Sequence, residues 1–184
     1  MEAVRSVRAL KPFFERYTRR TFAELAIGGE EIVDYVAELL ARFSRSEALP
    51  GPAGRREREP LHSVVEMLVA AQEGLGEGEA AAVDRQRDLH QHVADYCLFM
   101  SGVFREYATA RSFLGLYLTE GQRAYHEVFE FDQSRYRPGA QIFRELAEQF
   151  ESYSGALDYM KKVYFHPDLY QRLYYRVLRE IYGL

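Results

Sequence analysis

Four side chains that ionise or bind metals recur at helical spacing in the middle of the chain. They are, in order, Asp84, Asp88, His92 and Asp95. Because a helix turns roughly 100° per residue, steps of four, four and three residues place them within about 80° of one another on one face. The segment is highly charged before Tyr96 and almost entirely apolar after it, so we expect this face to border a dry core. Carboxylates and imidazoles in such a place could bind a metal ion or transfer protons.

A metal site is the first chemistry that this pattern allows. Asp88 and His92 are four residues apart, and His126 and Glu130 repeat this spacing in a later helical segment. If the two helices are antiparallel neighbours, these four ligands converge as in metal-binding four-helix bundles, and the set suits Zn, Mn or Fe. Against this, the apolar residues of its own segment place His126 on the solvent side. The alternative is a solvated helix face with ion pairs along the helix and no cofactor.

A short motif on the same helix allows a second chemistry. Arg87-Asp88-Leu-His-Gln-His92 has an arginine, a polar residue, three more residues and a histidine. It resembles the motif of HEPN-domain ribonucleases, an all-α family. The resemblance implies that the motifs of two protomers meet across a dimer and cleave RNA without a metal. It also implies that Arg87 binds the phosphate and that His92 acts in acid–base catalysis.

Tyrosine is concentrated near the carboxyl terminus, where the sequence predicts a last helix. Tyrosine combines a large contact area with a polar tip, which favours protein interfaces. We therefore expect the chain to self-associate as a homodimer, the simplest symmetric assembly. An ordinary wide core is the alternative use of these side chains. The interface residues that we predict are Tyr170, Tyr174, Tyr175 and Tyr182.

Helical periodicity runs through almost the whole chain, and no segment has the pattern of a long strand. Gly28-Gly29 separates two amphipathic helices, which predicts an antiparallel hairpin. Thr119 and Gln122 have the spacing of a capping box, which predicts that a helix begins there. Apolar residues recur at steps of three and four between 142 and 164, which predicts one long helix with Gly155 as the place for a kink.

The composition agrees with one helical domain. The chain has 184 residues, of which 47% are hydrophobic. We therefore expect a single all-α domain over residues 1–184, a bundle of six or seven helices arranged as antiparallel helical hairpins. Residues 46–59 are rich in proline, glycine and charge, which predicts a flexible loop. The net charge of −4 argues against nucleic-acid binding.

These observations also bound location and function. Cys97 is the only cysteine, the amino terminus lacks the pattern of an export signal, and no apolar run is long enough to span a membrane. We expect a soluble bacterial cytoplasmic protein that does not enter a membrane. The function that we expect is a helical interaction or scaffold protein that self-associates. The alternatives are a metal-binding helical-bundle enzyme and a HEPN-like metal-independent ribonuclease, so whether the chain is an enzyme stays open.

Overall fold

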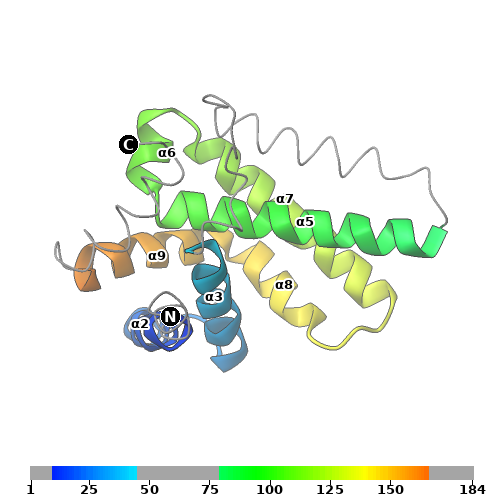
Figure 1. Ribbon diagram of the computed structural model, residues 1–184, viewed down its shortest axis with the longest axis horizontal. Helices are drawn as coiled ribbons and strands as arrows, with labels where there is room; N and C mark the ends of the chain where they lie inside the picture. Colours follow the sequence, from blue (N-terminus) through cyan, green and yellow to red (C-terminus); the bar gives the residue numbers. More distant parts are fainter. Residues whose placement is uncertain (1–9, 45–78, 166–184) are drawn as a thin grey trace, which may run out of the picture.

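The fold is built from α-helices. The computed structural model describes residues 10–44 and 79–165, and within these ranges it contains seven helices and no strand (Figure 1). The all-α bundle predicted from periodicity is confirmed. None of the helices in the described ranges has both the length and the hydropathy to cross a bilayer. The predicted loop at 46–59 and the predicted C-terminal helix lie outside these ranges. The helices are α2 (Leu10–Leu25), α3 (Glu30–Phe43), α5 (Glu79–Gly102), α6 (Arg105–Ala110), α7 (Leu114–Ser134), α8 (Ala140–Glu148) and α9 (Phe150–Tyr164).

Helices α2 and α3 form the predicted antiparallel hairpin. Ion pairs tie their exposed sides together at both ends. Lys11 Nζ lies 2.8 Å from a Glu38 oxygen, and Arg19 Nη2 lies 2.7 Å from a Glu30 oxygen. In the turn, Gly28 has a φ of +66°, which glycine adopts without the steric cost of a Cβ atom. The glycine pair read from the sequence therefore marks the turn correctly.

Helix α5 is the central element, since it packs against α3, α6, α7 and α9 (Figure 1). It runs antiparallel to α7, so that the start of α5 lies beside the end of α7. All residues from Val93 to Phe104 are buried, whereas positions 84–92 are exposed or half-buried. The predicted change from a polar to an apolar segment is therefore confirmed. Buried apolar side chains from α3, α5, α7, α8 and α9 join in one core.

Two glycines allow α5 to pack closely on its neighbours. A Cβ atom on Gly121 of α7 would lie 2.8 Å from the Cβ of Cys97 and 2.2 Å from a ring carbon of Phe150. A Cβ atom on Gly102, at the end of α5, would lie 2.6 Å from the Cβ of Leu157 in α9. The helices therefore leave no room for a side chain at either position. The thiol of Cys97 is fully buried at the first of these contacts, and burial raises its pKa far above the ordinary value.

Helix α7 begins earlier than the sequence predicts, at Leu114 rather than at Thr119. Thr119 is exposed within the helix, so the predicted capping box is wrong. Tyr117 is completely buried in the first turns of α7. Because most helical stability in proteins comes from packing an apolar face, burial of this turn outweighs the local capping signal.

The predicted long helix between residues 142 and 164 is interrupted. The break falls at Gln149 instead of Gly155. The two halves run in different directions, with α8 against α7 and α9 against α5 and α2 (Figure 1). Tyr153 of α9 donates a hydrogen bond of 2.5 Å to a Glu145 carboxylate oxygen of α8 across the break. The apolar stripe stays in phase on both sides, which is why periodicity alone does not locate the break.

Candidate functional site

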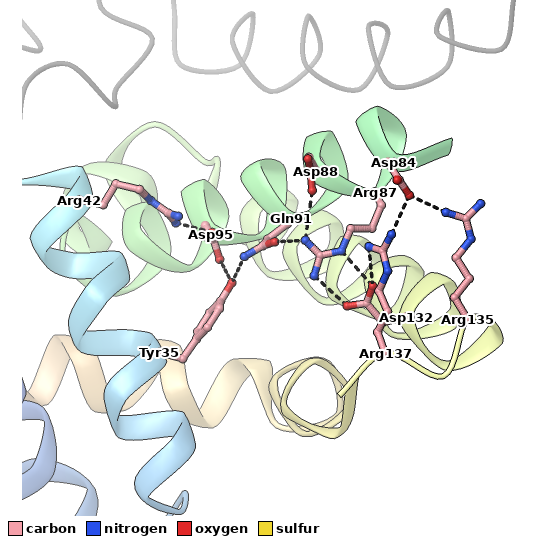
Figure 2. Close-up of polar contacts among 10 residues, drawn as sticks. All are labelled: Tyr35, Arg42, Asp84, Arg87, Asp88, Gln91, Asp95, Asp132, Arg135 and Arg137. Carbon is pink, nitrogen blue, oxygen red and sulfur yellow. Dashed lines mark hydrogen bonds and ion pairs between the residues drawn. The ribbon is translucent and has the colours of Figure 1, made fainter. Parts of the chain in front are cut away.

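A buried carboxylate lies where α3, α5 and α7 meet. Asp95 of α5 is 1% exposed. Tyr35 Oη lies 2.5 Å and Tyr125 Oη 2.7 Å from its Oδ1, so both hydroxyls donate to the same oxygen. Arg42 donates to the other oxygen, Oδ2, through Nη2 (Figure 2). Burial of a charged group is tolerated when such donors replace water, and this carboxylate has donors on both oxygens.

The surroundings of Asp95 determine the protonation of the cluster. Burial raises the pKa of Asp95 because it disfavours the charged form, while Arg42 and the tyrosine hydroxyls oppose that shift. Burial and the charge of Asp95 raise the pKa values of Tyr35 and Tyr125 well above the ordinary value. Both tyrosines therefore stay protonated at neutral pH and act as hydrogen-bond donors rather than as bases.

A glutamine connects this carboxylate to a second polar centre along α5. Gln91 Nε2 donates to Tyr35 Oη at 3.0 Å, and its Oε1 accepts a hydrogen bond from Arg87. The hydroxyl of Tyr35 thus accepts from Gln91 and donates to Asp95. Figure 2 shows these side chains in a row beside α5. The row links the apolar part of the helix to its charged part without a gap in hydrogen bonding.

The second centre is an ion pair between α5 and the end of α7. Arg87 donates to both oxygens of Asp132, through Nε at 3.0 Å and Nη2 at 2.7 Å. The two side chains are 15% and 3% exposed. Arg137, in the turn after α7, contacts Asp132 at 3.3 Å, and the guanidinium of Arg87 lies 5.2 Å from the ring centroid of Phe143 in α8. A bidentate pair of this kind fixes orientation as well as adding energy.

The row ends at the exposed start of α5. Asp84, whose side chain is 52% exposed, accepts hydrogen bonds from Arg137 at 2.7 Å and from Arg135. These bonds attach the turn between α7 and α8 to α5 (Figure 2). Tyr136, between the two arginines, is 95% exposed and has a φ of 52°, which is unusual for an aromatic residue.

The predicted metal ligands lie in separate surroundings. Asp88 is 73% exposed and pairs with Arg87 at 3.2 Å. His126 Nδ1 lies 3.7 Å from a Glu130 oxygen, and both side chains are exposed on α7. Across residues 10–44 and 79–165, no three His, Cys, Asp or Glu side chains are grouped so that they could hold a metal ion. The structure therefore brings His126 and Glu130 together without a third ligand.

His92 lies at the contact between α5 and α3. Its ring stacks on Phe43 with the ring centroids 5.8 Å apart. Burial lowers the pKa of His92, the charge of Arg42 lowers it as well, and the charge of Asp95 opposes both. Burial also lowers the pKa of His90. Both imidazoles are therefore neutral at pH values where a solvated histidine is partly charged.

The lowered pKa of His92 predicts how its contribution to stability changes with pH. A group whose pKa is lower in the folded protein stabilises the fold above its unfolded-state value, here 6.5, and this contribution is lost as the pH falls through the folded value. On going from about pH 7 to about pH 5, His92→Gln should gain about 1 kcal/mol of unfolding free energy relative to the wild type. Denaturant unfolding followed by circular dichroism measures this difference. The exposed His126→Gln is the matched control, and an equal gain in both variants would contradict the prediction.

The two key residues of the ribonuclease-like motif have different partners. The guanidinium of Arg87 is engaged by Asp132, Gln91 and Asp88, so a phosphate would have to displace a buried carboxylate to reach it. His92 packs on Phe43. The catalytic dimer stays a prediction, since it requires a second protomer. The tyrosines predicted to form the interface lie outside the described residues: Tyr170, Tyr174, Tyr175 and Tyr182.

Sequence reasoning missed most of the polar row, by which we mean the linked side chains Arg42, Asp95, Tyr35, Gln91, Arg87 and Asp132. It does not single out Asp132, which is a buried residue of α7. A signal was present, because Asp132 follows Ala124 and Val128 at steps of four and therefore shares their buried face. Arg42 carries no comparable signal, since the partner that distinguishes it from other surface arginines comes from another helix.

Comparisons with known proteins leave the site to be interpreted from its geometry. Protein-family models, curated proteins and solved structures gave no match to the chain. The functional proposal therefore rests on the contacts, burial and charges of the described residues.

Proposed function

We propose that the chain is a non-catalytic helical interaction module that self-associates. The proposal rests on one observation about the described surface. Large apolar side chains are exposed at few positions there, and most of them belong to α2 or α9, two helices that pack against each other. These exposed side chains are Leu25, Tyr159 and Val163, with Tyr136 as the remaining one.

One contact between α2 and α9 lies close in sequence to these exposed residues. Tyr159 Oη lies 3.4 Å from a Glu24 oxygen, and Leu25 is the next residue along α2. Val163 follows Tyr159 by one helical turn and therefore shares its face of α9. Exposed apolar residues on neighbouring helices can contribute to a protein contact surface. The tyrosine-rich segment predicted to form the homodimer interface follows α9 directly in the sequence.

The polar row supports a structural rather than a catalytic role for α5. Its buried acids, Asp95 and Asp132, each bond to an arginine from another part of the fold. Such pairing occupies the hydrogen-bond donors and acceptors that a substrate would need. It also fixes α3, α5 and α7 relative to one another. We place this module in a bacterial cytoplasm, where the lone Cys97 would stay reduced.

The proposal predicts that one exposed residue controls self-association and another does not. Val163→Lys should raise the dissociation constant of the homodimer by about tenfold or more, because a charge replaces an apolar contact. Sedimentation velocity of the full chain over a range of micromolar concentrations measures the constant. Lysine near the end of α9 suits the helix dipole, so folding should not suffer.

The matched control for this experiment is Tyr136→Lys. Tyr136 is 95% exposed and lies in the turn between α7 and α8, far from the end of α9 (Figure 1). This variant should dimerise like the wild type, whereas Tyr175→Glu should weaken the dimer as Val163→Lys does. A wild-type chain that stays monomeric at every concentration, or equal effects of both lysine substitutions, would contradict the proposal.

The two enzymatic alternatives stay predictions without a supporting contact in the described residues. The metal-binding enzyme needs ligands beyond the pair His126 and Glu130. The ribonuclease needs Arg87 to leave Asp132. Metal analysis of the purified protein and an RNA-cleavage assay on the His92→Ala variant address them separately.

A further inference from the structure

The ion pair between Asp95 and Arg42 is asymmetric. The side chain of Asp95 is 1% exposed, whereas that of Arg42 is 40% exposed. Arg42 belongs to the last turn of α3, and Asp95 belongs to α5. Arg42 can therefore reach water by turning its side chain, whereas Asp95 cannot.

The two oxygens of Asp95 are used differently. Oδ1 accepts from Tyr35 and Tyr125, which are held in the core by their rings. Oδ2 accepts from Arg42. A proton that binds the carboxylate therefore goes to Oδ2, because Oδ1 already accepts from both hydroxyls. The new O–H group would face a guanidinium N–H, and two donors cannot bond to each other.

We propose that Asp95 is a proton-operated latch that fixes the end of α3. When a proton from water binds Oδ2, the hydrogen bond from Arg42 breaks and the charged guanidinium turns into solvent, while Tyr35 and Tyr125 keep their bonds to Oδ1. No other bond forms or breaks, and Arg42 keeps its charge. When the proton leaves, the carboxylate recaptures Arg42. This inference does not depend on self-association.

Four side chains face Asp95, and their effects on its protonation differ. From α3 these are Arg42 and Tyr35, from α7 Tyr125, and from α5 His92. Burial raises the pKa of Asp95 against the opposing effects of Arg42 and the tyrosines, so this carboxylate binds a proton at a higher pH than a solvated aspartate does. The tyrosines stay protonated because their pKa values are raised. A proton on His92 would repel Arg42 but would also stabilise the charged form of Asp95, and burial, which lowers the pKa of His92, favours its neutral form.

Nuclear magnetic resonance of the full chain tests the latch. The carboxyl carbon of Asp95 reports protonation, and the Nε signal of Arg42, identified by its loss in Arg42→Lys, reports the position of the guanidinium. Both signals of the wild type should move with one midpoint as the pH falls. In Asp95→Asn at neutral pH, Arg42 should already occupy the released position, and its Nε–H should exchange about tenfold faster than in the wild type.

Two variants separate the latch from other causes. Asp84→Asn removes an acid that bonds to arginines on the same helix and should keep the wild-type transition. His92→Gln should keep it too. An Arg42 signal that stays fixed while Asp95 titrates would overturn the proposal, and so would a transition of Arg42 that disappears in His92→Gln. The wild-type titration decides the matter even if Asp95→Asn does not fold.

Discussion

Asp95→Leu should lower the free energy of unfolding by about 3–5 kcal/mol. Removing one partner of a buried ion pair leaves the charge of the other partner uncompensated. Here the substitution leaves the hydroxyl of Tyr125 buried without its acceptor and deprives Tyr35 and Arg42 of theirs. Because the stability of a domain is typically about 5–15 kcal/mol, this one change should consume a large part of it. Urea unfolding followed by circular dichroism at neutral pH measures the loss.

Asp95→Asn is the control for that prediction. Its side-chain oxygen can still accept from Tyr35 and Tyr125, and only the contact with the half-exposed Arg42 is lost. We expect a loss of about 1.5–3 kcal/mol, the range for one hydrogen bond to a charged group. If leucine and asparagine cost the same, the two tyrosine hydroxyls would not depend on this acceptor, and the site would be described wrongly.

Gly121→Ala should destabilise the fold by about 3 kcal/mol, although alanine is the better helix former. The added methyl group would lie 2.8 Å from the Cβ of Cys97. It would also lie 2.2 Å from a ring carbon of Phe150. The first contact involves atoms close to the backbone of α5, so relief requires α5 and α7 to move apart. The measurement is the same denaturant unfolding.

A second glycine of the same helix supplies the control. A Cβ atom on Gly115 would meet nothing within 4 Å. Gly115→Ala should therefore leave packing unchanged and raise stability by up to about 1 kcal/mol through helix propensity. Opposite signs for the two substitutions are the expected result. A stabilising Gly121→Ala would show that α5 and α7 do not approach as closely as described.

The sequence predicts the elements of the fold better than their ends. The antiparallel hairpin at Gly28 and the buried half of α5 follow from glycine placement and hydrophobic periodicity, which are local properties. The start of α7 and the break at Gln149 do not. Both are set by which neighbouring helix each turn packs against, and that information is distributed over distant segments. Local signals at Thr119 and Gly155 therefore pointed to the wrong positions.

The candidate site was predictable only in part. The residue pattern of α5 correctly indicates a helix with a polar and an apolar half, and Asp95 lies at the boundary between them. It groups Asp95 with Asp84 and Asp88, whereas the structure gives each a different partner. The partners Tyr35 and Arg42 come from positions more than 50 residues away. Helical spacing describes one face of one helix and carries no information about such partners.

The break at Gln149 has a consequence for how this segment can vary in length. Helices α8 and α9 continue one apolar stripe but pack against different helices. The number of residues across the break therefore sets how α9 is rotated about its axis relative to α8. Inserting a single residue there would turn α9 by roughly 100° and move buried side chains such as Phe150 to exposed positions of the helix. Relatives of this chain should therefore tolerate insertions in the turn that carries Tyr136 but keep a constant residue count through the break.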